Sequence, residues 1–374
     1  MRAVIVGSGG IARIHALLIE QLGGTVAAVC GRTLAGAASL GRGQAYDNLA
    51  AMLRDERPDV VHVCSPNYLH AEHAIAALAA GAHTVCEKPL ATTRDEALRM
   101  VEAADRSGRV AAVCYTYRGY PLIQELRLAV AAGRYGKLRR VAGEYLSQDV
   151  FDPDKYVWHF TRGMSGPAFV LLDYGVHWFD LIEHVTGQRI AEVSSQFSTH
   201  IPRRVWRGGA GEGPAPSYGR ALTGGGIEVD VELEDHADVL IRLDGGAAGA
   251  ATITALSLGN PNHIVISVDG EDGGFDWCQE TADTYVERRL NEKALRYRDP
   301  QRLPEDLAWT SKVPAGHPEG YLDAFRNVLG SAWRAMRGDR DVQYPTFADG
   351  CRGNAIVDAA IESARTRRPA APRA

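Results

Sequence analysis

The first twelve residues constrain the fold more than any other part of the chain. An apolar run, 2–6, leads directly into a G-x-G-x-x-A pattern between a predicted strand and a predicted helix. In such a turn the first glycine permits the bend, the second lets the backbone approach a pyrophosphate, and the alanine allows close helix–strand packing. The N–H groups of the helix N-terminus attract the anion. The pattern therefore predicts a dinucleotide site formed by Gly7, Ser8, Gly9, Gly10, Ile11 and Ala12.

The choice between NAD and NADP depends on the residues after the second predicted strand. NAD sites usually place Asp or Glu there for the ribose 2′-hydroxyl, whereas NADP sites favour arginine for the added phosphate. This chain has Arg32 and Thr33 at that point and no carboxylate. The sequence predicts that both contact the cofactor and favours NADP over NAD. The alternative is that Arg32 lies in a solvated turn and Thr33 caps a helix.

The first third of the chain alternates short apolar strands with helical patterns. Strands are expected near 2–6, 26–30, 60–64, 84–86 and 110–115, and helices near 11–21, 34–40, 68–80 and 94–107. This alternation is typical of right-handed βαβ units and a doubly wound parallel sheet. We expect residues 1–120 to form an α/β dinucleotide-binding domain of the Rossmann type.

The pattern changes after residue 120, where strands follow one another across glycine-bearing turns. Strands are expected near 138–147, 227–232, 237–243, 247–255, 264–268 and 274–278, and helices over 122–132 and 167–185. Residues 121–374 are thus predicted to form an α+β domain with a large, mostly antiparallel open sheet. A Gly- and Pro-rich loop is expected over 207–226, and disorder over about the last eight residues.

Composition and charge exclude several classes of protein. A chain of 374 residues with a formal net charge of −5 favours two domains and gives no basic surface for nucleic acid or an anionic membrane. The first residues lack a signal-peptide pattern, and no apolar run approaches the roughly 20 residues that span a bilayer. Six scattered cysteines without a CxxC spacing favour small buried side chains over metal ligands or disulfides. We therefore expect a cytoplasmic protein with no metal.

Several further segments converge on one family. They are Ser65-Pro66-Asn67-Tyr68-Leu69-His70, Cys86-Glu87-Lys88-Pro89-Leu90, Asp173-Tyr174-Gly175-Val176-His177, Glu234-Asp235 and His317-Pro318-Glu319-Gly320-Tyr321. With these motifs in this order, nearly the whole chain resembles the glucose-fructose oxidoreductase/inositol dehydrogenase (Gfo/Idh/MocA) family. The resemblance implies a cis proline after Lys88 and a homodimer or homotetramer formed through the sheet of the second domain.

The resemblance also assigns cofactor contacts beyond the glycine turn. It implies that the dinucleotide is bound by Ser65, Asn67, His70, Glu87, Lys88 and Arg118. Asn67 could instead be a helix N-cap, and Glu87 is expected to support Lys88 rather than react.

The chemistry of alcohol oxidation suggests roles for three residues of these motifs. Hydride leaves an alcohol carbon easily only while the hydroxyl proton is removed, and a base with a pKa near the working pH favours histidine. We assign His177 as the base for oxidation or the acid for reduction, Asp173 as the group that orients it or bonds the substrate, and Lys88 as the charge that stabilises the alkoxide. All three are expected to contact substrate.

The same helix carries two further polar residues. Asp173, His177, Asp180 and His184 recur at helical spacing and form one stripe, of which the last two are expected to be structural. Gly175 within this helix indicates either close approach of a ligand or close helix packing.

Two departures from the family pattern leave the substrate open. The chain has Ser165-Gly166-Pro167 where the family often has three glycines, and Trp158-His159 where Trp-Arg is frequent. We expect His159 and His317 to contact substrate. The sequence thus predicts an NAD(P)-dependent dehydrogenase or reductase acting on a secondary alcohol or ketone of a sugar, cyclitol or related polyhydroxylated molecule. A glycoside hydrolase that oxidises its substrate transiently and a non-catalytic ligand-binding relative are the alternatives.

Overall fold

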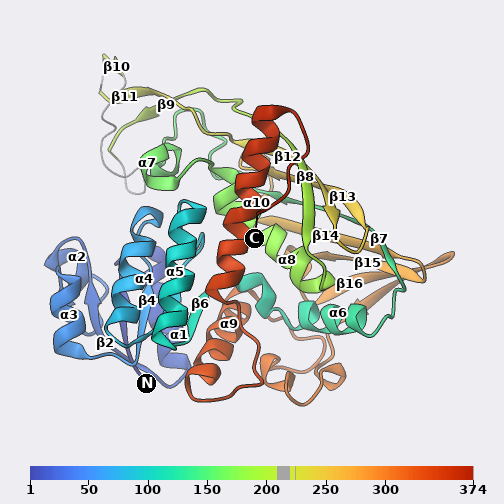
Figure 1. Ribbon diagram of the computed structural model, residues 1–374, viewed down its shortest axis with the longest axis horizontal. Coiled ribbons are helices and arrows are strands. Elements are labelled where there is room, and N and C mark those ends of the chain that lie inside the picture. The colour runs from blue at the N-terminus through green and yellow to red at the C-terminus, as the bar shows by residue number, and fades with distance from the viewer. Residues whose placement is uncertain (209–219, 224, 374) are drawn as a thin grey trace. The chain divides into compact units, whose positions relative to one another are not determined.

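The computed structural model describes residues 1–208, 220–223 and 225–373. It divides into two compact units, each described here by itself: the first unit comprises Met1–Gly119 and Tyr321–Asn354, and the second comprises Tyr120–Gly320 and Ala355–Ala374 (Figure 1). The expectation that 121–374 forms one continuous domain differs from this division, because residues 321–354 return to the first unit. No helix in the described part of the chain is long and apolar enough to cross a membrane.

The first unit is built on a six-stranded parallel sheet. Its strands are β1 (Arg2–Val6), β2 (Thr25–Cys30), β3 (Gln44–Tyr46), β4 (Val60–Val63), β5 (His83–Cys86) and β6 (Ala111–Val113), in the order β3-β2-β1-β4-β5-β6. All neighbouring strands pair in parallel, which confirms the predicted doubly wound sheet. The strand order reverses between β1 and β4, and ligands of such sheets bind outside the carboxyl ends of the strands at this point.

Helices connect these strands much as the alternation predicts. They are α1 (Gly10–Gln21), α2 (Leu34–Ala38), α3 (Leu49–Glu56), α4 (His70–Ala79) and α5 (Arg94–Ser107). The bounds of α5 agree with the prediction, and the side chain of Thr93 caps its start by accepting the Glu96 N–H. The short elements β3 and α3 were not predicted, because three strand residues and eight helical ones carry too little periodicity to detect.

A helix from the far end of the chain completes the core of the first unit. It is α9 (Tyr321–Met336), whose Phe325, Leu329 and Trp333 are fully buried in the same cluster as Ile5 of β1 and Ile19 of α1. Residues separated by some three hundred positions in the sequence therefore share one hydrophobic core.

The second unit contains an eight-stranded sheet. Its strands are β7 (Leu138–Leu146), β8 (Ile190–Ser198), β12 (His236–Leu243), β13 (Ala248–Thr254), β14 (His263–Gly270), β15 (Gly273–Cys278), β16 (Thr284–Arg289) and β17 (Glu292–Tyr297), in the order β17-β16-β15-β14-β7-β13-β12-β8. Only β13 and β7 pair in parallel, which confirms the mostly antiparallel sheet. The sequence prediction missed β8, β16 and β17, where charged and polar residues interrupt the apolar alternation.

A separate three-stranded sheet contains a strand expected in the large one. It comprises β9 (Arg203–Trp206), β10 (Arg220–Ala221) and β11 (Ile227–Asp230), in the order β10-β11-β9. The loop predicted over 207–226 falls largely on 209–219 and 224, outside the described residues, and Arg220–Ala221 is a strand rather than loop.

One face of the eight-stranded sheet is covered and the other is open. Along β12, Ala237, Val239 and Ile241 are buried, whereas the alternate side chains are exposed. The covered face packs against α8 (Val176–Thr186), which contacts β7 and β14, and α8 in turn packs on α6 (Pro121–Ala131). We call the face that carries Asp238, Leu240 and Arg242 the open face.

The end of the chain is more ordered than predicted. The last helix, α10 (Phe347–Thr366), is followed by a bridge in which Ala370 donates to the Val193 carbonyl at 2.9 Å and accepts from the Val193 N–H at 2.8 Å. The expected disorder of the last eight residues is therefore wrong at Ala370, because the edge strand β8 offers unpaired backbone groups that the tail takes up.

Candidate functional site

The glycine turn after β1 leaves room for a phosphate group. Gly7 has φ +117°, and a Cβ added there would lie 2.3 Å from the Cys64 carbonyl oxygen, so no other residue fits. At Gly9 and Gly10 an added Cβ would meet nothing within 4 Å. Gly9 is also the N-cap of α1 and offers no side-chain cap to its first N–H groups. Open space beside uncapped N–H groups fits the pyrophosphate of a dinucleotide.

The contacts of the residues after β2 differ in part from the prediction. The Thr33 hydroxyl accepts the Gly36 N–H at 3.0 Å and caps α2, which is the alternative that the sequence left open. Arg32 is exposed and forms no ion pair with any residue that the structure describes. Arg32 therefore supplies a cation at the point where dinucleotide-binding folds recognise the ribose.

His70 has a different role from the one the resemblance implied. Its ring is fully buried, with Nε2 2.8 Å from the Ser65 carbonyl oxygen and Nδ1 2.8 Å from the Pro89 carbonyl oxygen. Burial lowers the pKa of this imidazole, and the two carbonyl contacts oppose that shift. Because both ring nitrogens contact the backbone, His70 connects the loop after β4 to the turn after β5 and cannot bind a cofactor through its ring nitrogens.

Asn67 begins a 3-10 helix, Asn67–Leu69, and does not cap α4. Its side-chain Nδ2 is buried and has no hydrogen-bond partner. A buried amide donor without an acceptor is costly, and a ligand oxygen at this edge of the sheet would relieve that cost. The orphaned amide is thus a second observation that fits a bound dinucleotide.

Lys88 is half-buried directly after β5 and precedes a cis peptide bond to Pro89, as the resemblance implies. The backbone N–H of Lys88 donates to Glu87 Oε2 at 3.2 Å. Gly7, Ser65 and Lys88 follow three different strands, so all lie at the carboxyl edge of one parallel sheet.

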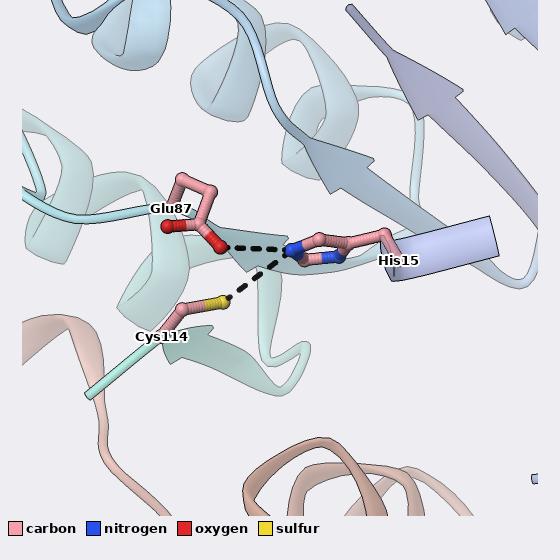
Figure 2. Close-up of side chains that lie close together, drawn as sticks. All are labelled: His15, Glu87 and Cys114. Atoms are coloured by element: carbon pink, nitrogen blue, oxygen red, sulfur yellow. Dashed lines mark hydrogen bonds and ion pairs between the residues drawn. The ribbon is translucent and has the colours of Figure 1, made fainter. Parts of the chain in front are cut away.

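Glu87, the neighbour of Lys88 in the sequence, belongs to a buried polar network (Figure 2). His15 of α1 donates from Nε2 to Glu87 Oε1 at 2.8 Å, and Cys114 Sγ lies 4.0 Å from the same nitrogen. Burial raises the pKa of Glu87, but the hydrogen bond from His15 and the charge of Lys88 outweigh it and lower the pKa overall. The carboxylate beside Lys88 is therefore held in its ionised form.

The network continues from His15 to His62 of β4. The two Nδ1 atoms are 2.8 Å apart, and both rings are fully buried. Burial, with the neighbouring His15, holds the pKa of His62 well below its ordinary value. A neutral His62 that donates from Nδ1 to His15 leaves its Nε2 without a hydrogen, in agreement with the lack of any partner for that atom.

The helix that carries Asp173 and His177 is not continuous. It was predicted from Pro167, but helical structure begins at Val170, and a π-helical turn, Leu171–Gly175, precedes α8. π turns are frequent at functional sites because they change the direction in which side chains project. Asp173 lies within the π turn and is half-buried, whereas His177 lies in α8 and is 6% exposed.

The other polar residues of this stripe lie in packed surroundings. Asp180 is buried, and His184 Nε2 lies 3.1 Å from Gln124 Nε2 of α6. A Cβ on Gly175 would lie 3.0 Å from Leu171 Cδ2 and 3.3 Å from Phe179 Cε2. Close packing therefore accounts for this glycine without a ligand.

A series of aromatic contacts links His159 to His177 within the second unit. His159 lies 5.8 Å from Phe169, Phe169 lies 5.9 Å from Tyr174, and Tyr174 lies 5.0 Å from Tyr145, all between ring centroids. Tyr145 then lies 6.3 Å from His177. The structure thus links His159 and His177 through one aromatic cluster.

Glu234 fixes the start of the helix that carries Asp173. Its Oε1 accepts the Phe169 N–H at 2.8 Å and the Leu171 N–H at 3.4 Å. Burial raises its pKa to about 7, although the backbone hydrogen bonds act in the opposite direction. Glu234 stood out in the sequence only as part of a family motif, and its capping role could not be deduced from a residue more than sixty positions away.

Glu234→Gln is expected to remove part of the pH dependence of stability. In the folded protein Glu234 stays protonated to about pH 7, whereas the unfolded chain ionises near 4.5, so stability falls as pH rises between these values. The variant should equal the wild type near pH 4.5 and exceed it at pH 8 by as much as about 3 kcal/mol.

Denaturant unfolding at several pH values measures this difference. Glu232→Gln is the matched control, because Glu232 lies two residues away with its side chain 74% exposed. Parallel pH profiles for wild type and Glu234→Gln would contradict the assignment.

Two other predicted site residues have different surroundings. Arg118 pairs with Asp349 at 3.2 Å inside the first unit. His317 is exposed, whereas Glu319 of the same motif is buried and pairs with Arg298 at 3.1 Å. The described placement thus indicates a structural role for the buried part of that motif, and it does not bring His317 into the aromatic cluster.

Comparisons with known proteins agree with this geometry. Residues 1–115 match a model described as an oxidoreductase family with an NAD-binding Rossmann fold, and residues 123–276 match the GFO/IDH/MocA C-terminal domain. Levoglucosan dehydrogenase of Pseudarthrobacter phenanthrenivorans is 29% identical over 321 residues, which cover 84% of this chain and 80% of that enzyme. D-glucoside 3-dehydrogenase of Escherichia coli is 33% identical over 193 residues, covering 50% and 54%.

A solved structure agrees over the full length. An oxidoreductase domain protein from Kribbella flavida has a TM-score of 0.86 and 28% identity, covering 100% of this chain and 99% of that one. The open glycine turn, the Lys88 and His177 motifs and the two family models lead to one conclusion: the chain belongs to the Gfo/Idh/MocA family of oxidoreductases.

Proposed function

We propose that the protein transfers hydride between a nicotinamide dinucleotide and a secondary hydroxyl or ketone of a sugar, anhydrosugar, glycoside or cyclitol. The observation that carries this proposal is the open glycine turn at the same sheet edge as Lys88. The relatives named above act on levoglucosan and on D-glucosides, which supports a carbohydrate substrate. The first unit would bind the dinucleotide, and the second would bind substrate.

The residues of the first unit would bind and orient the cofactor. The N–H groups at the start of α1 would bind the pyrophosphate beside Gly9 and Gly10, and the Asn67 amide would donate to a cofactor oxygen. The bound nicotinamide supplies the hydride acceptor or donor. Lys88 would stabilise the negative charge that develops on the substrate oxygen, and the ionised Glu87 beside it would hold the lysine in position.

The residues of the second unit would move the proton. His177 would take the hydroxyl proton during oxidation and return it during reduction. Asp173, one helical turn earlier, would orient the imidazole or accept a substrate hydroxyl. His159 belongs to the same aromatic cluster and would contact the sugar.

We propose NADP as the preferred cofactor, because Arg32 offers an exposed cation where no carboxylate follows β2. Arg32→Ala should weaken NADPH binding about tenfold and change NADH binding little, because only NADPH has the 2′-phosphate. Fluorescence titration with each reduced cofactor measures both constants. Equal losses for the two cofactors would contradict a phosphate contact.

A screen of substrates tests the function itself. Wild-type protein is incubated with NAD⁺ or NADP⁺ and with levoglucosan, methyl glucosides and myo-inositol, and the nicotinamide absorbance is followed. Reduction of the cofactor with at least one substrate is expected. Sugar release without net cofactor reduction would show transient oxidation instead, and cofactor binding without any product would indicate a ligand-binding relative.

The oligomeric state and the cellular location of the protein are also proposals. The open face exposes large apolar side chains, with Leu240 62%, Leu295 54% and Tyr297 56% exposed, which supports a homodimer or homotetramer formed through this sheet. None of the six cysteines forms a disulfide bond, which supports the reducing cytoplasm. Light scattering would contradict the first of these if it showed a monomer.

A further inference from the structure

A cluster of metal-ligating groups lies on the open face of the eight-stranded sheet. His263 Nδ1 lies 2.8 Å from Glu280 Oε2 and 3.8 Å from Cys278 Sγ, and His263 Nε2 lies 3.4 Å from Glu144 Oε1. One ligand atom each from His263, Cys278 and Glu280 lie within 4.8 Å of one another. We propose that these three residues bind a divalent transition-metal ion of the zinc class, with Glu144 supporting the histidine.

Strand register explains why these groups meet. His263 begins β14, and two residues later Val265 lies opposite Cys278 of β15 on one side and Glu144 of β7 on the other. Glu280 follows in the 3-10 turn Gln279–Thr281. Because side chains alternate along a strand, His263, Cys278 and Glu144 project from the same face of the sheet.

Cys278 would change its protonation state on binding a metal. Burial raises the pKa of its thiol, with a smaller contribution from the Glu280 charge, and the backbone N–H groups of Glu280 and Thr281 oppose this shift only in part. A metal ion would supply the positive charge that the thiolate lacks here, and binding would release the thiol proton to solvent.

The charge of the cluster also favours a cation. Among the described residues, neither Glu144 nor Glu280 has a lysine or arginine partner; each contacts only His263 within ion-pair distance. In a single chain, side-chain exposures of 20% for His263, 39% for Glu144 and 41% for Glu280 let an ion reach them from solvent. The site therefore also requires that the oligomer proposed above leaves this end of the sheet uncovered.

The mixture of ligands selects the class of metal. Thiolate and imidazole suit zinc-like ions, whereas magnesium and calcium prefer oxygen ligands alone. If Nδ1 of His263 coordinates, Nε2–H donates to Glu144, the usual arrangement in which a carboxylate orients a metal-bound histidine. Three protein ligands leave one tetrahedral position for water.

The cluster of His15, Glu87 and Cys114 does not offer the same site. All three residues are buried, and burial and the Glu87 carboxylate hold the pKa of Cys114 well above its ordinary value. Its thiol is hydrogen-bonded to Glu87, so a metal would have to displace a protonated thiol in the core.

Cobalt binding to the full-length, chelator-treated protein tests the site without reference to catalysis. Co²⁺ should bind one per chain and give a thiolate-to-cobalt charge-transfer band. Cys278→Ser should abolish the band, His263→Ala should weaken binding strongly, and Glu144→Gln should weaken it about tenfold. His236→Ala is the matched control, because His236 forms a 3.1 Å pair with Asp238 on the same face without a thiol nearby.

A second measurement needs no variant. Cys278 is the one half-buried cysteine, and the other five are buried, so a thiol reagent should label Cys278 first in the native protein. Zn²⁺ should slow that labelling, as mapped by mass spectrometry of the modified peptide. Unchanged labelling with Zn²⁺, or a cobalt band that survives Cys278→Ser, would overturn the proposal and leave His263 in contact only with Glu144 and Glu280.

Discussion

Lys88→Ala is expected to lower kcat by about a hundred- to a thousandfold, as loss of one transition-state charge contact does in other enzymes. Lys88 follows β5 at the sheet edge that carries the glycine turn, and Glu87 beside it is held ionised. The ammonium would stabilise the substrate alkoxide, which exists only as hydride leaves, so the loss should fall on kcat more than on cofactor affinity. His177→Asn should lower kcat by about a hundredfold or more, because the proton acceptor is removed.

Steady-state kinetics and fluorescence titration of the dinucleotide separate these effects. Lys137→Ala is the control for an exposed lysine, and His184→Ala is the control for a histidine on the same helix as His177. Both should stay near wild-type activity. Unimpaired turnover in Lys88→Ala and His177→Asn would remove the assigned mechanism, even if the dinucleotide still binds.

His15→Leu is expected to destabilise the protein by about 3–5 kcal/mol, because it removes the imidazole donor from the buried Glu87 carboxylate. Glu87 is 8% exposed and its ionised form depends on the hydrogen bond from His15 Nε2. The variant should also lose activity, since a carboxylate that shifts or takes up a proton no longer fixes Lys88. Denaturant unfolding measures the first effect, and kcat with saturating cofactor measures the second.

A double variant shows whether the charge is the cause. In His15→Leu/Glu87→Gln the uncompensated charge is gone, so stability should recover in part while activity stays low. Cys114→Ala is the comparison variant, because it removes an uncharged thiol contact of the same network and leaves the His15 donor in place. Equal unfolding free energies for His15→Leu and Cys114→Ala would show that the carboxylate does not depend on His15.

Local patterns were sufficient to predict most of the parallel sheet of the first unit and much of the second sheet. The glycine turn, strand–helix alternation and the Thr93 cap all depend on neighbours in sequence, and β1 and α5 have the predicted bounds. By contrast, α9 was not predicted as part of the first core, because its burial depends on residues some three hundred positions away. The charged strands β16 and β17 were missed for a related reason: their partners, not their composition, make them strands.

The candidate site, too, was predicted in part. Motifs located Lys88, Asp173 and His177, but the buried pair of His15 and His62 was missed, although one polar residue in the apolar strand β4 was a usable signal. The contacts of His70 with two backbone carbonyl groups could not be deduced from its motif, because they depend on how the loops after β4 and β5 fold. The π turn at Leu171–Gly175 could not be foreseen, since it depends on how the helix packs and on the cap from Glu234.

Because α9 lies near the end of the chain, the first unit cannot complete its core early in synthesis. A ribosome that has synthesised the first 119 residues has produced every strand of the parallel sheet but not Phe325, Leu329 or Trp333, which fill its core. The second sheet cannot form early either, since β7 must pair with β13 and β14, which lie more than a hundred residues downstream. Neither unit can finish folding until most of the polypeptide has been translated, so nascent chains expose apolar surface for much of synthesis, which makes such chains prone to aggregation.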